Sequence, residues 1–168
     1  MTSDSAPILA WAESDADRRA AAQFFARVVR ADPTYISHGE IQWALSPDGV
    51  HWAPDLEARL EREFVGADAP ALLIARLEGA IAGAASVSWI EDAPTPHGVL
   101  NDLAVAPEAR RHGIARMLVA AVEQRARERE IGWMFLESGL GNEGAHRFFE
   151  TEDYAPVSKV FAKRLTGE

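Results

Sequence analysis

The segment that most constrains the fold is 99–130, in which a short basic loop separates a strand pattern from a long helix pattern. A strand pattern runs up to Val105, and Pro107 ends it. Residues 110–115 read Arg-Arg-His-Gly-Ile-Ala, and an apolar stripe with helical spacing begins at Ile114. Such a loop leaves backbone N–H groups without helical partners at a helix N-terminus, beside positive side chains. It therefore predicts an anion site suited to phosphate.

Charge and composition limit the partners of the chain. The formal net charge of −9 over 168 residues disfavours nucleic acid and anionic membrane surfaces, because phosphate repels such a chain. No apolar run approaches the roughly 18 residues of a membrane span, and the first residues lack a signal-peptide pattern. The chain has no cysteine, which excludes disulfides and a cysteine nucleophile. We expect a cytoplasmic protein that binds neither nucleic acid nor membrane.

Hydrophobic periodicity predicts one α/β domain over residues 1–168. We expect helices at 15–30, 55–64, 114–130 and 142–150, and strands at 7–11, 71–77, 80–91, 98–105, 132–138 and 154–165. The first strands should be antiparallel, and the helical crossover should make 98–105 and 132–138 parallel neighbours. The result is a mixed central sheet, antiparallel and then parallel at the basic loop, with helices on both faces. We expect residues 132–138 to be buried and Gly132 to cap the preceding helix.

Residues 34–64 form a less regular segment, rich in aromatic residues over 34–54 and punctuated by a Ser-Pro-Asp-Gly turn signal at 46–49. Two interpretations stand side by side. Tyr35, His38 and Glu40 line a substrate pocket, or the aromatic residues of this segment anchor it to the core.

Two blocks of the sequence resemble the GNAT superfamily of acyl-CoA N-acetyltransferases. Residues 103–115 contain every named position of the family pattern Leu-x-Val-x-Pro-x-x-Arg-x-x-Gly-x-Gly/Ala. Residues 142–149 read Asn-x-x-Ala-x-x-Phe-Phe, similar to the family's Asn-x-x-Ala-x-x-Phe-Tyr. The order of predicted strands and helices agrees across about 70–165. The resemblance implies the GNAT fold, in which 34–64 is the variable substrate-side segment.

The same resemblance implies acetyl-CoA as the donor and coenzyme A as a product. The pyrophosphate cradle would fall on Arg110, Arg111, His112, Gly113, Ile114 and Ala115, with Arg116 adjacent. The backbone of Leu103, Ala104 and Val105 would pair with the pantetheine arm as an extra strand, and one of these N–H groups would polarise the thioester carbonyl. Asn142 would bind near the pantetheine, cap the helix that follows, or do both. Phe149 closes the second block, so the resemblance places it beside the donor.

The family's reaction is direct attack of a neutral amine on the thioester, which needs a base and benefits from an acid. Asn101 and Asp102 occupy a place where family members often carry an acidic pair. Adjacent strand residues face opposite ways, so both reach the substrate only if a bulge intervenes. Asp102 is the first candidate for the base, acting through water; alternatively, it makes a structural hydrogen bond to a neighbouring loop. Glu91 is a candidate for substrate binding or for the base. The other candidates for the base are Glu137, Ser138, His38 and Glu40.

The usual acid of the family is a Tyr, and here its position is Phe149. Three explanations stay open: the thiolate leaves unassisted, His146 donates the proton, or the protein binds acyl-CoA without transfer. His146 shares a helix face with Asn142 and Phe149. A second departure is Asp153-Tyr154 in place of Gly-Phe, where Asp tolerates a left-handed turn.

The resemblance thus implies an N-acetyltransferase acting on a primary amine of a small molecule or peptide. Aminoglycosides, polyamines, amino acids and protein N-termini all remain open as acceptors. The competing interpretations are an acyl-CoA-binding regulatory domain with little transferase activity, and a phosphate-binding interaction module. No spacing of His or acidic residues predicts a metal site. The resemblance alone suggests a homodimer.

Overall fold

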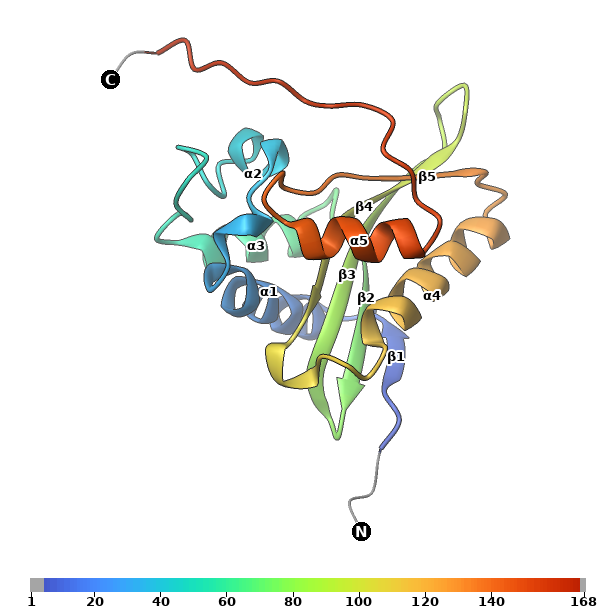
Figure 1. The fold of residues 1–168 in the computed structure, drawn as a ribbon. Helices are drawn as coiled ribbons and strands as arrows, with labels where there is room; N and C mark the ends of the chain where they lie inside the picture. The colour runs from blue at the N-terminus through green and yellow to red at the C-terminus, as the bar shows by residue number, and fades with distance from the viewer. Residues whose placement is uncertain (1–4, 167–168) are drawn as a thin grey trace. The chain divides into compact units, whose positions relative to one another are not determined.

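The computed structural model describes residues 5–166 and contains a five-stranded sheet of order β1-β2-β3-β4-β5 (Figure 1). The strands are β1 (Ile8–Trp11), β2 (Ala71–Leu77), β3 (Ala80–Ile90), β4 (His97–Val105) and β5 (Trp133–Leu136). The first four are antiparallel neighbours, and β5 pairs parallel with β4. This confirms the mixed sheet predicted from the sequence.

The helices also follow the predicted order. They are α1 (Asp15–Arg30), η1 (Pro33–Tyr35), α2 (His38–Gln42), α3 (Leu56–Val65), η2 (Pro107–Ala109), α4 (Ile114–Glu128) and α5 (Glu143–Thr151). Ser14 caps α1 by accepting a hydrogen bond from the Asp17 N–H. The prediction that Gly132 caps α4 was wrong. Glu130 takes the left-handed conformation there, with φ of 57°, and the Ile131 N–H donates back to Ala126. Among residues 5–166, none of the helices has the length and apolar character needed to cross a bilayer.

The chain divides into two compact units. The sheet unit comprises Met1–Asp32 and Asp55–Glu137, and the second unit comprises Pro33–Pro54 and Ser138–Glu168. The sheet unit therefore contains all five strands with α1, α3 and α4. The second unit contains η1, α2, α5 and the C-terminal segment.

The sheet unit is a three-layer structure in which α1 and α3 cover one face of the sheet and α4 covers the other (Figure 1). Phe25 and Phe64 meet edge to face at 5.6 Å in the first layer. On the other face, Ile114 and Leu118 are buried, and their side chains pack against Gly83 of β3. The N-terminal turn of α4, which carries the basic loop, is thereby anchored to the sheet.

The structure corrects two predictions at the end of the sheet. The predicted strand over 154–165 is absent; the segment is extended but forms no strand, and residues 155–166 are exposed. A strand pattern does not form a strand by itself, because its backbone groups need those of a neighbouring strand to pair with. As a consequence, β5 is an edge strand and not the buried one we expected. Trp133 and Phe135 are 58% and 40% exposed.

Candidate active site

The candidate site begins at an irregularity in the central strand. The register pairs Asp102 of β4 with Ser86 of β3, but Leu100 with Val87, so Asn101 is an extra residue in β4. This arrangement is a β-bulge, which increases the local twist of a strand and can redirect a side chain. A bulge was the condition under which Asn101 and Asp102 could both face a substrate, and the strand contains one.

Because of the bulge, Asn101 and Asp102 share the face of the sheet that carries Ser86 and Ser88. The Asn101 Nδ2 donates to the Ser88 Oγ at 2.9 Å. Asp102 is half-buried and lies opposite Ser86. The Ser86 hydroxyl is fully buried and has no hydrogen-bond partner within residues 5–166. Polar groups thus gather on one face of β3 and β4, at the level of the bulge.

The pairing between β4 and β5 ends at the same level. Its last pair is Leu100 with Leu136, one residue before the bulge. Within the described chain, no strand lies along the outer edge of β4 over 103–105, although β3 pairs with its inner edge there. This outer edge can accept an extended ligand through backbone hydrogen bonds.

The basic loop follows this edge directly. Arg111 and Gly113 both take the left-handed conformation, with φ of 77° and 70°. Gly113 is the residue before α4, and no side chain caps the first N–H groups of that helix. Arg110 and Arg111 are exposed, and neither has an acidic partner among residues 5–166. The loop thus combines helical N–H groups that no side chain caps with two arginines, as an anion site requires.

The other loop residues named from the sequence are arranged around this start of α4. His112 and Arg116 are exposed, Ala115 is half-buried and Ile114 is buried. The Ile114 side chain therefore packs in the core, whereas its backbone belongs to the first turn of α4.

Glu91 lies at the opposite end of the sheet from the loop. It follows Ile90, which pairs with His97 at the start of β4. Its carboxylate accepts a hydrogen bond from the Arg129 Nε at 2.7 Å, and the Arg129 guanidinium lies over the Trp89 ring at 5.4 Å. This ion pair was not predicted from the sequence. It binds the Glu91 carboxylate to a cation of the same chain.

In the second unit, Asn142 caps α5: its Oδ1 accepts from the Ala145 N–H at 3.3 Å. His146, one turn further, is hydrogen-bonded through Nε2 to the Gly139 carbonyl at 3.0 Å. A carbonyl only accepts, so this contact places the proton on Nε2.

Gly139 also joins α5 to the segment around η1. A Cβ at this position would lie 2.6 Å from the Ile36 carbonyl oxygen and closer still to that of Thr34, so only glycine fits. Tyr35 and His38 are half-buried in the same segment. The substrate-side candidates and α5 thus belong to one packed unit.

Glu40 has a structural role that the sequence analysis missed. Its Oε2 accepts from the Ser37 N–H and the Ser37 hydroxyl, both at 2.7 Å, at the start of α2. The Ser-x-x-Glu spacing at 37–40 is the capping-box signal that could have indicated it.

Tyr154 is a residue that sequence reasoning treated only as a fold detail. Its ring meets that of Phe149 edge to face at 5.7 Å, and its N–H donates to the Phe149 carbonyl at 2.9 Å. Asp153 makes the turn possible by taking φ of 66°, as expected for a left-handed position. A phenol therefore lies beside the phenylalanine that stands where the family has a tyrosine.

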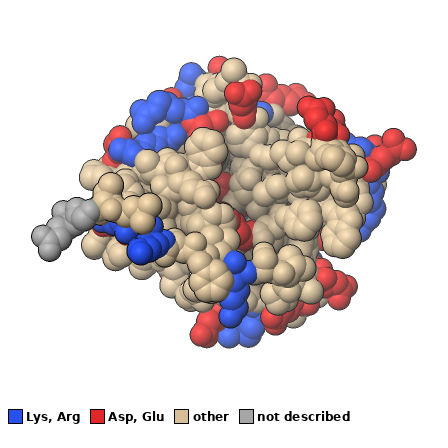
Figure 2. Space-filling model, turned by 90° about the horizontal axis from the view of Figure 1, so that it is seen from above, with Lys and Arg blue, Asp and Glu red and all other residues tan. Residues whose placement is uncertain are grey.

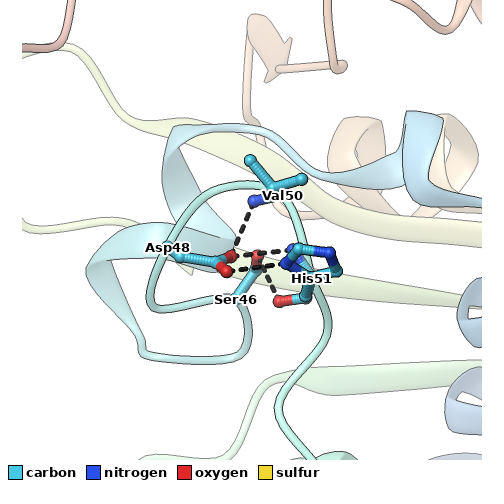
Figure 3. Close-up of polar contacts among 4 residues, drawn as sticks. All are labelled: Ser46, Asp48, Val50 and His51. Carbon is cyan, nitrogen blue, oxygen red and sulfur yellow. Dashed lines mark hydrogen bonds and ion pairs between the residues drawn. The ribbon is translucent and has the colours of Figure 1, made fainter.

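The turn at 46–51 contains a second arrangement not foreseen (Figure 3). Asp48 Oδ1 accepts from the N–H groups of Val50 and His51 at 2.8 and 2.7 Å, and Oδ2 contacts the His51 Nδ1 at 2.8 Å. Chiefly the His51 backbone N–H, and then its ring, hold the pKa of Asp48 well below its usual range. The Ser46 hydroxyl donates to the His51 carbonyl at 2.7 Å. The His51 ring is therefore oriented by a carboxylate while its side chain stays 80% exposed.

Charged side chains of both signs are interspersed on the face drawn in Figure 2, and much of that face is uncharged. Over the described part of the chain, no three His, Asp or Glu side chains are grouped so that they could hold a metal ion.

Solved structures share this fold. An aminoglycoside N-acetyltransferase AAC(6')-Iy in complex with CoA matches with a TM-score of 0.70 and 17% identity, covering 98% of this chain and 97% of that one. A ribosomal-protein-alanine N-acetyltransferase from Brucella melitensis biovar Abortus 2308 matches with a TM-score of 0.68 and 17% identity, covering 95% and 99%. An aminoglycoside acetyltransferase from an uncultured soil metagenomic sample matches with a TM-score of 0.61 and 19% identity, covering 96% and 97%.

Sequence comparison gives the family. No curated protein matches the chain significantly. The model of the acetyltransferase (GNAT) family matches residues 38–152, more than half of the chain, and includes both blocks found by inspection. The chain therefore belongs to the acetyltransferase (GNAT) family and is an acetyl-CoA-dependent N-acetyltransferase.

Proposed function

We propose that this enzyme transfers the acetyl group of acetyl-CoA to a primary amine of a cationic acceptor. The observation that carries the proposal is the outer edge of β4 over 103–105, with which no strand pairs among residues 5–166 and which leads into the basic loop at 110–116. The pantetheine arm pairs with this edge as an added strand. The pyrophosphate binds the first N–H groups of α4, with Arg110 and Arg111 at its outer oxygens.

The bulge supplies the groups for the transfer. An N–H of residues 103–105 polarises the thioester carbonyl and stabilises the oxyanion that forms as the amine attacks. Asp102 accepts the proton of the amine through a water molecule, and Asn101 orients the acceptor from the same face of the sheet. The shared face at the bulge supports this pairing of roles.

Tyr154 provides the phenol that protonates the departing thiolate. The family's phenol would stand at Phe149, and the edge-to-face contact brings the Tyr154 ring against that position. The two departures from the family pattern, Phe149 and Tyr154, thereby compensate each other. His146 holds Gly139 and positions α5.

The acceptor is proposed to be cationic because the chain carries a net charge of −9. Two of the similar structures cited above are enzymes named for aminoglycosides and one for a ribosomal-protein alanine. Tyr35 and His38 are the proposed contacts of the acceptor. An aminoglycoside is the first acceptor to test, and a peptide with an N-terminal alanine is the second.

One alternative has an observation in its favour. Phe149 cannot donate a proton, so the protein could bind acyl-CoA with little transfer. We therefore expect a direct assay to separate the two functions. With acetyl-CoA and a panel of aminoglycosides, polyamines, amino acids and alanine peptides, thiol release should rise above the amine-free rate for at least one amine. The transferase function is contradicted if calorimetry shows that acetyl-CoA binds but no amine of the panel raises thiol release.

The donor site predicts a selective effect of Ala115→Glu. A carboxylate in the first turn of α4 is favourable for the helix by about 0.3–1 kcal/mol, so stability should not fall. The same charge repels pyrophosphate, and we expect the Kd for acetyl-CoA to rise about 10- to 100-fold. Ala120→Glu, an exposed position of the same helix, is the matched control and should bind normally. Equal Kd values for the two variants would show that the donor lies elsewhere.

Asp102 as the base predicts that Asp102→Asn lowers kcat by about 100-fold or more, since positioned general bases contribute on the order of 10²–10⁴. The Kd for acetyl-CoA should change by less than about threefold, a difference of under about 0.7 kcal/mol. Asp92→Asn, an exposed carboxylate in the loop after β3, is the control. Retained kcat in Asp102→Asn assigns the base to another residue.

If Tyr154 supplies the phenol that the family has at position 149, Phe149→Tyr should restore the activity lost in Tyr154→Phe. Tyr154→Phe removes only the hydroxyl and should lower kcat about 10- to 100-fold while the KM for acetyl-CoA stays nearly constant. Combining it with Phe149→Tyr, which restores the family's residue, should recover much of the rate. Unchanged kcat in Tyr154→Phe excludes this phenol as the acid. Parallel losses of kcat and thermal stability would indicate a purely structural residue.

A further inference from the structure

Lysine is almost absent from this chain, and its two lysines lie close together. Of the 17 Lys and Arg residues, only Lys159 and Lys163 are lysines, and the other 15 are arginines. The difference matters for an enzyme that acetylates amines. A lysine can lose a proton and become a nucleophilic amine, whereas the guanidinium of arginine stays protonated in proteins. Lys159 and Lys163 therefore carry the only side-chain amines that the enzyme's own reaction can modify.

Both lysines belong to the C-terminal segment 155–166. This segment is extended, forms no helix or strand, and exposes each of its residues (Figure 1). Neither lysine has a hydrogen-bond or ion-pair partner among residues 5–166. Exposed terminal segments without secondary structure are where other enzymes most readily reach a chain. The two amines are thus presented as they would be on a free peptide.

The charge of this segment matches the acceptor class proposed above. The segment carries Lys159, Lys163 and Arg164 and no acidic residue over 155–165. The chain as a whole carries −9, so the rest of the chain is more acidic still. A second molecule of the enzyme therefore attracts this cationic segment, for the same reason that a cationic acceptor is proposed.

We propose that the enzyme acetylates Lys159 and Lys163 on other copies of its own chain, an inference that rests on the transferase function proposed above. The lysine ammonium first gives one proton to the base, and its Nζ then attacks the thioester carbonyl of acetyl-CoA. A C–N bond forms and the C–S bond breaks. The second proton of the amine ends on the departing thiolate, so the products are an acetylated lysine and coenzyme A.

Acetylation changes the segment in a way that limits the reaction. Each transfer removes one positive charge, because the amide that forms is neutral. Complete modification leaves Arg164 as the one basic residue over 155–165, and no side-chain amine remains in the chain. The self-directed reaction therefore stops after two acetyl groups per chain, whereas a free amine in excess continues to turn over.

The test is incubation of the full chain with acetyl-CoA and no added amine. We expect a burst of two thiols per chain, one for each lysine, and mass spectrometry of the digested protein should find acetyl groups on both. Lys159→Arg combined with Lys163→Arg keeps the charge and removes both amines. This variant should show no burst, and its kcat with a free amine acceptor should equal that of the wild type.

Two measurements separate the enzyme's reaction from chemical acetylation by acetyl-CoA alone. The rate per chain should rise with protein concentration, because two molecules must meet, whereas a chemical rate would stay constant. In Ala115→Glu, at acetyl-CoA below its Kd, modification of the lysines should slow by the same factor as transfer to a free amine.

The possible results distinguish this inference from the proposed function. The inference is overturned, and the transferase function stands, if an amine of the panel is acetylated while both lysines stay unmodified. Acetylation confined to the α-amino group, or a rate per chain that does not depend on protein concentration, also overturns it. Acetylated lysines without turnover of any small amine would instead contradict a small-molecule acceptor. Absence of transfer to every amine, lysines included, contradicts both.

Discussion

The extra residue that β4 inserts at Asn101 governs both halves of the candidate site. A regular strand would send Asn101 and Asp102 to opposite faces of the sheet. The bulge puts them on one face, beside Ser86 and Ser88. The pairing of β4 with β5 also stops there, so no strand of the described residues pairs with the outer edge over 103–105. The proposed catalytic side chains and the proposed backbone template for the donor therefore have the same local cause.

The anion site depends on that strand through packing. Ile114 and Leu118 hold the first turns of α4 against β3, and β3 is the strand that defines the bulge. The loop is short, since Val105 ends the strand and Ile114 begins the helix. The spacing between the outer edge of β4 and the start of α4, the two parts of the proposed donor site, is thus set within one compact unit. The proposed donor site therefore belongs to the sheet unit, whereas the proposed acceptor contacts and Tyr154 belong to the second unit.

Local signals in the sequence allowed the elements around the basic loop to be predicted. Pro107, Gly113 and the apolar stripe from Ile114 act within a few residues of one another, so strand, loop and helix were recognised correctly. The bulge was not predictable, because register depends on the partner strand and not on β4 alone. The burial of β5 was overestimated for a related reason: an apolar run does not reveal whether a neighbour covers it. The Glu40 cap was readable from its Ser-x-x-Glu spacing, and the Tyr154 contact required the fold.

The central claim is that acetyl-CoA occupies the outer edge of β4 and the start of α4. Amide hydrogen exchange of the full chain, with and without acetyl-CoA, tests it most directly because it reports on the backbone groups involved. If acetyl-CoA binds there, exchange should slow on binding in peptides that cover 103–105 and 111–116, with little change at β1. Tight binding that leaves both of these segments exchanging at their original rates would contradict it.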